Sequence, residues 1–119
     1  MTFDIEIVLR ERDSAVTEQI VHEGNDPSRW TEGDVEAVLK SMLLAIDRLK
    51  NPAASERHVT LRGFSWIVEP AVGGVVIAIE IPSGAAVAGP FTIDQRALDL
   101  LINRVLAAAA ARPARTVVH

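Results

Sequence analysis

The feature that most constrains this fold is the run Val-Val-Ile-Ala-Ile-Glu-Ile at residues 75–81. Two glycines precede the run and Pro-Ser-Gly follows it, so turn-forming residues bracket both of its ends. In a strand, successive side chains point to opposite faces, and both faces of this run are apolar as far as Glu80. The β-branched residues and the turn-forming residues on both sides favour a strand over a buried helix segment. The run therefore predicts a strand central in a sheet or covered on both faces.

Four other segments carry strand-like patterns. Residues 2–10 alternate between apolar and polar side chains, which is typical of a strand with one buried face. Residues 15–22 predict the return strand of a hairpin, although a short helix competes because their alternation is poor. Residues 58–69 have strand character with a change of phase at Gly63, where we expect a bulge. Residues 84–90 predict a short edge strand or an ordered apolar loop.

Two segments show the spacing of amphipathic helices. The first begins at a possible Thr31 N-cap, has acidic residues in its first turn and stops before Pro52. The second begins at Thr92 or Asp94 and stops before Pro113, and Thr92 lies three residues before a glutamine, the spacing of a capping box. The stripes expected to face the core are Val35, Val38, Leu39, Met42, Leu43, Ile46 and Leu49 in the first helix and Leu98, Leu101, Ile102, Val105 and Ala109 in the second.

These elements predict one α+β domain over residues 1–119, with about 112–119 as a loosely held tail. The expected fold is a two-layer sandwich in which an antiparallel sheet of about four strands carries two helices on one face, in the order ββαββα. The chain has no cysteine, which excludes disulfides and thiolate sites. It also lacks an apolar run of the ~20 residues that span a bilayer and a basic-apolar leader, so we expect a cytoplasmic protein with no membrane partner.

The expected arrangement of the sheet gives the main indication of function. Two helices cover one face, yet Val76 and Ala78 place apolar groups on the other. Phe64 and Trp66 are expected to add to this second face. An exposed apolar patch beyond a few hundred Å² usually indicates a partner. We therefore predict that these residues bind a protein, and that a second copy using the same patch forms a homodimer.

The formal net charge of −4 is distributed unevenly along the chain. Residues 1–34 contain three arginines against nine carboxylates. This balance argues against direct binding of nucleic acid, which requires a basic face. It allows a basic protein partner, as for an inhibitor or immunity-type protein, with Glu6, Glu11 and Glu18 as the candidate contacts. The alternative is an ordinary solvated strand surface.

No motif for catalysis or for a cofactor stands out. Metal-ligand spacing does not connect the three histidines, His22, His58 and His119, so no metal site is predicted. Glu69 and Glu80 could approach each other as a carboxylate pair on neighbouring strands, although two solvated carboxylates fit the sequence better. The leading interpretation is a small non-catalytic protein that binds another protein and itself. The alternative is a small-ligand-binding or enzymatic α+β protein with a pocket between the sheet and a partner subunit.

Overall fold

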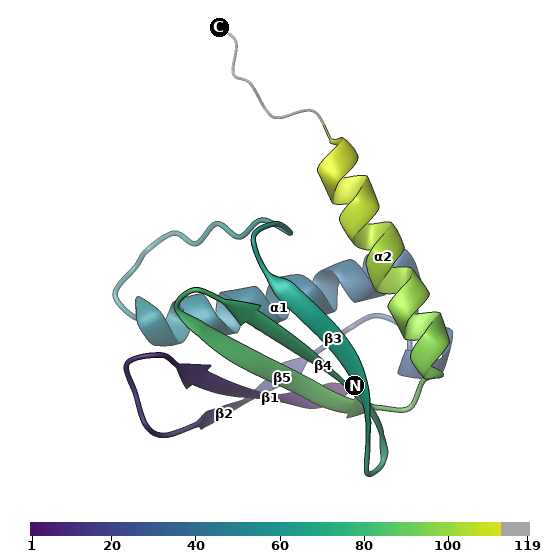
Figure 1. Cartoon of the computed structure of the whole chain (residues 1–119), viewed down its shortest axis with the longest axis horizontal. Helices are drawn as coiled ribbons and strands as arrows, with labels where there is room; N and C mark the ends of the chain where they lie inside the picture. The colour runs from purple at the N-terminus through teal and green to yellow at the C-terminus, as the bar shows by residue number, and fades with distance from the viewer. Residues whose placement is uncertain (113–119) are drawn as a thin grey trace, which may run out of the picture.

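The computed structural model describes residues 1–112, which form an antiparallel sheet of five strands with two helices packed on it, in the order ββαβββα (Figure 1). This confirms the predicted two-layer α+β sandwich and adds one strand to it. The expected tail lies almost wholly outside the described residues. The strand order is β2-β1-β5-β4-β3. The elements are β1 (Thr2–Leu9), β2 (Val16–Val21), a short 3-10 helix at Pro27–Arg29, α1 (Glu32–Lys50), β3 (Ser65–Ala71), β4 (Gly74–Ile81), β5 (Gly84–Phe91) and α2 (Gln95–Ala111).

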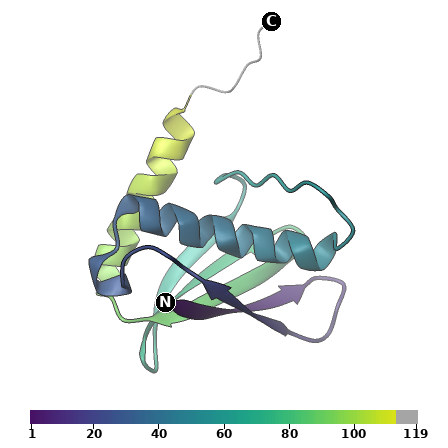
Figure 2. The ribbon, with the colours of Figure 1, turned by 180° about the vertical axis from the view of Figure 1, so that it is seen from behind.

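The core lies between the sheet and the helices. Helix α1 packs on β1 and β5, and α2 packs on β3 and on α1. Figure 1 views the sheet from the side away from α1, and Figure 2 shows α1 in front of the sheet. Alternate strand residues point into this core, as the period of a strand requires. The buried strand residues are Phe3, Ile5, Ile7, Leu9, Val68, Val75, Ile77, Ile79, Ala86, Ala88 and Phe91.

Both helices start at side-chain caps. Thr31 caps α1, and a reciprocal capping box joins Thr31 to Asp34. Asp94, the second of the two candidates, caps α2 by accepting a hydrogen bond from the backbone N–H of Ala97. The predicted apolar stripes face the core, although Leu49 and Leu101 are only half-buried. Neither helix of the described chain is long and apolar enough to cross a membrane.

Strand β5 occupies the centre of the sheet, between β1 and β4. Residues 84–90 therefore belong to a strand, but this strand is central and is neither the edge strand nor the loop expected from the sequence. Glycine and alanine have low strand propensity, and pairing on both sides overrides that preference. The core-facing residues Ala86 and Ala88 are almost fully buried, and α1 packs over this strand.

The hairpin predicted at the start of the chain is confirmed, because residues 16–21 form β2 and pair with β1. The strand predicted for residues 58–69 is confirmed only from Ser65 onward. Gly63 lies in a bend with φ +76°, not in a bulge, and the register shift of the sheet occurs between Val75 and Ile77 instead. The loop before β3 still contributes Leu61 to the core.

Candidate protein-binding surface

The side of the sheet that turns away from the helices, here called the open face, carries an apolar strip. The strip crosses four strands, because the register places Val8 opposite Ala85, Val87 opposite Ala78 and Ala78 opposite Ile67. Its members are Val8, Ile67, Val76, Ala78, Ala85 and Val87.

The strip is open to solvent. Val8 is 42% exposed, Val87 38% and Ile67 51%, while Val76 and Ala78 are half-buried. A sheet covered by helices on one side ordinarily presents polar residues on its other side. The exposure of three β-branched side chains in neighbouring rows is therefore a departure from that pattern and marks the strip as a candidate contact surface.

Four exposed carboxylates surround the apolar strip and are here called the acidic rim. Glu6 lies opposite Val87, Glu80 opposite Ala85 and Glu69 opposite Val76. The fourth member is Asp4, two residues before Glu6 on the same face of β1. None of the five described strands contains a lysine or an arginine. The open face is thus apolar in the middle and negatively charged around it.

A depression of about 630 Å³ lies at the end of the open face, next to the β4–β5 turn. Val8 and Ala85 of the apolar strip form part of its lining. Phe64, Arg10 and Glu80 also line it, which brings one cation and one carboxylate to the same hollow. The apolar strip therefore leads into a depression that also presents one positive and one negative side chain.

The structure brings together only some of the residues predicted from the sequence to bind a partner. Val76, Ala78 and Glu6 share the open face, and Phe64 borders it through the depression. Trp66 does not, because it pairs with the core-facing Ile79 and packs half-buried on the helix side.

The residue of β3 that does join the open face is Ile67, directly opposite Ala78. The expectation that Trp66 shares the face of Val76 is corrected by this pairing. The pairing register, which decides the face of each β3 side chain, is a long-range property that residues 64–68 do not encode locally.

The acidic residues predicted as one group lie in three places. Glu6 belongs to the acidic rim, and Glu11 is exposed in the connection between β1 and β2. Glu18 points to the helix side and forms an ion pair with Arg48 of α1. The structure also separates Glu69 from Glu80, because Glu69 lies opposite Val76, four residues or about 13 Å along β4 from Glu80. The carboxylate-pair hypothesis is therefore wrong.

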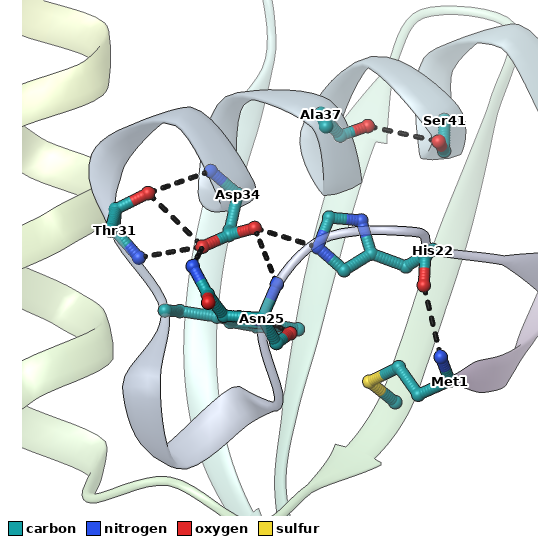
Figure 3. A network of polar contacts seen from close by, with 8 residues as sticks. Met1, His22, Asn25, Thr31, Asp34, Ala37 and Ser41 are labelled. Atoms are coloured by element: carbon teal, nitrogen blue, oxygen red, sulfur yellow. Dashed lines mark hydrogen bonds and ion pairs between the residues drawn. The ribbon is translucent and has the colours of Figure 1, made fainter.

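A buried polar network joins the end of β2 to the start of α1 (Figure 3). His22 and Asp34 are 8% and 7% exposed, and the Nε2–H of His22 donates to Oδ1 of Asp34 over 3.0 Å. The backbone N–H of Asn25 donates to the same oxygen. The other oxygen, Oδ2, accepts from the Asn25 side chain, from the Thr31 backbone and from the Thr31 hydroxyl.

This network determines the charge state of Asp34. Burial raises the pKa of the carboxyl group, and the hydrogen bonds from Thr31, Asn25 and His22 outweigh burial, so the pKa lies well below its ordinary value of 3.8. The imidazole of His22 and the hydroxyl of Thr31 both donate to Asp34, whose lowered pKa makes its carboxylate a weak base that does not activate the hydroxyl. Its evident role is to hold the loop before α1.

The sequence contained part of the signal for this network. Thr31 and Asp34 have the spacing of a capping box, which predicts the helix start. The contact of His22 with Asp34 requires the loop between them to fold back, and no local pattern indicates that. Within residues 1–112, His, Asp and Glu side chains form no group of three or more that could hold a metal ion.

Comparison of the chain with models of protein families, with curated proteins and with solved structures found no match.

Proposed function

We propose that the protein is a non-catalytic interaction module that binds another protein through the open face. The observation that carries this proposal is the apolar strip, which crosses β1, β5, β4 and β3 and leaves Ile67 half exposed. The strip lies on regular strands, so its shape is fixed before a partner arrives, and little conformational entropy is lost on binding.

The exposed part of the strip is large enough to contribute to affinity. Full burial of a valine or isoleucine side chain contributes about 1.5–3 kcal/mol, so covering the remaining exposed part of Val8, Val87 and Ile67 contributes about 1 kcal/mol each. The concave end beside Phe64 offers a place for one larger apolar side chain of the partner. Such a pocket is where the strongest contacts of an interface are usually found.

The depression also favours a second candidate function, the binding of a small ligand. Arg10 and Glu80 line a hollow of about 630 Å³ beside apolar groups, and convergent polar groups in a concave site are typical of ligand pockets. A partner covering the open face would close the mouth of this hollow. The two candidate functions predict different bound molecules after purification: a protein partner for the first and a small ligand for the second.

The test is capture of partners from the native host with three forms of the protein. Ile67→Lys places a charge in the apolar strip, and Leu100→Lys is its matched control, because Leu100 is also 51% exposed but lies on α2. We expect the wild type and Leu100→Lys to retain the same stoichiometric protein and Ile67→Lys to lose it. The retained protein is then identified by mass spectrometry, purified and recombined with all three forms.

Equal capture by all three forms would contradict a binding role for the open face. A small molecule that co-purifies with the wild type, and is lost on Arg10→Ala, would favour the ligand-binding alternative. Circular dichroism and thermal unfolding confirm that each form is folded before it is compared.

A further inference from the structure

We propose that the partner of the open face presents an apolar centre surrounded by lysine or arginine, and is not a second copy of this chain. This inference rests on the proposed function and specifies the chemistry of the partner. It follows from the acidic rim, none of whose carboxylates forms an ion pair within residues 1–112.

The charges on the two sides of the sheet are arranged differently. On the helix side, three carboxylates are paired within the chain: Glu18 with Arg48, Glu36 with Lys40, and Asp47 with Arg57. In residues 1–112, none of the ion pairs involves a member of the acidic rim. Of the nine carboxylates in residues 1–34, Asp4 and Glu6 lie on the open face, and Glu69 and Glu80 join them around the apolar strip.

The acidic rim flanks the apolar strip on both sides. Asp4 and Glu6 lie on β1, whereas Glu80 and Glu69 lie on β4 and β3. Strands β1 and β4 are two positions apart in the sheet, which separates their backbones by about 10 Å. A partner that sets apolar side chains on the strip can thus place one cation on each side of it. Ion pairs between these cations and the acidic rim would make binding specific and accelerate association.

A second copy of the chain supplies the wrong charges for this surface. Two open faces in contact bring eight carboxylates together, four from each acidic rim, and the strands provide no lysine or arginine. Arg10, which lines the depression together with Glu80, gives one cation per copy against four carboxylates. Carboxylates that lose water without gaining a cation oppose association. The homodimer predicted from the sequence is therefore disfavoured at this face.

A charge-reversed copy of the protein is a defined probe for this inference. It carries Asp4→Lys, Glu6→Lys, Glu69→Lys and Glu80→Lys, so it presents the same apolar strip within a basic rim. Light scattering coupled to size-exclusion chromatography is applied to each chain alone and to their equimolar mixture at micromolar concentration. We expect each chain alone to be a monomer of about 12.9 kDa and the mixture to form a heterodimer. High salt should weaken that heterodimer by roughly tenfold or more, because screening acts on exposed charges.

Two variants of the wild-type chain connect the heterodimer to the open face. Ile67→Lys should abolish the complex with the charge-reversed copy, and Leu100→Lys should leave it unchanged. If the charge-reversed copy does not fold, the double variant Glu6→Lys with Glu80→Lys replaces it, since these two positions place one cation on each side of the strip. Circular dichroism and thermal unfolding establish the fold of every chain used.

The outcomes separate this inference from the proposed function. A wild-type homodimer that Ile67→Lys dissociates would show that the occupant is a second copy; it would overturn the basic partner and leave the open face as a binding surface. A mixture that remains monomeric, or a complex that salt does not weaken, would also overturn the basic partner. In that case capture from the native host still decides whether the open face binds protein at all.

Discussion

The network around Asp34 leads to a quantitative prediction of stability. In Asp34→Asn, an amide replaces a carboxylate that accepts five hydrogen bonds, and its NH2 group cannot accept the two or three bonds made to the oxygen it replaces. Hydrogen bonds to a charged group contribute about 1.5–3 kcal/mol each, and an unpaired buried donor carries a further penalty. We expect the substitution to lower the free energy of unfolding by about 2–4 kcal/mol at neutral pH. Urea denaturation followed by circular dichroism measures this difference.

The same network predicts how stability changes with pH. The pKa of Asp34 is lower in the folded state than its ordinary value of 3.8, so the unfolded chain binds a proton more readily. The contribution of the carboxylate is therefore complete above the unfolded pKa and is lost progressively as the pH falls below about 4 toward the folded pKa. Asp34→Asn has no such proton to bind at this position. The gap in stability between wild type and variant should consequently narrow in acid.

Asp26→Asn is the matched control for this experiment. Asp26 is exposed, stands before the short 3-10 helix and makes no side-chain capping bond, so its substitution should change stability by less than about 0.5 kcal/mol. Equal effects of Asp34→Asn and Asp26→Asn would refute the reasoning. So would a gap between wild type and Asp34→Asn that stays constant through the acid range.

Three further predictions test packing, each by urea denaturation. Leu43→Ala should cost about 2–5 kcal/mol and Leu44→Ala clearly less, because Leu43 is buried and Leu44 half-buried; equal costs would disprove the register of α1. Leu98→Ala should likewise cost about 2–5 kcal/mol and Leu100→Ala under 1, because Leu98 is fully buried and Leu100 is 51% exposed. Gly74→Ala should destabilise the hairpin, since φ is +149° and the added Cβ lies 2.1 Å from the Phe91 carbonyl oxygen; an unchanged unfolding midpoint would contradict this contact.

The sequence predicted those elements whose signals are local. Helix α1 has its cap, its acidic first turn and its apolar stripe within one segment, so its position follows from the residues themselves. Strand β5 has little local signal, because its glycine and alanine residues form a strand only when β1 and β4 flank it. The same distinction explains why the sequence predicts the first strand correctly but predicts about four strands for a sheet that has five.

The candidate site divides in the same way. The alternation within β4 alone predicts that Val76 and Ala78 lie on an uncovered apolar face, without reference to any neighbouring strand. Their neighbours on other strands depend on the register, so the sequence does not indicate Ile67 and places Trp66 on the wrong face. The pairing of His22 with Asp34 also depends on how a loop closes, which the spacing of residues does not determine.

The central position of β5 has a consequence for the order in which the chain can fold. Strands β1 and β2 pair locally, as do β3 and β4, but β5 is the element that joins these two hairpins into one sheet. The contact between Ile5 and Ala88 spans most of the chain, and such long-range pairing is slow because the loop must close first. During synthesis, one edge of β1 therefore stays unpaired until the ribosome has released β5. Any truncation that ends before Gly84 leaves two separate hairpins, neither of which closes the core.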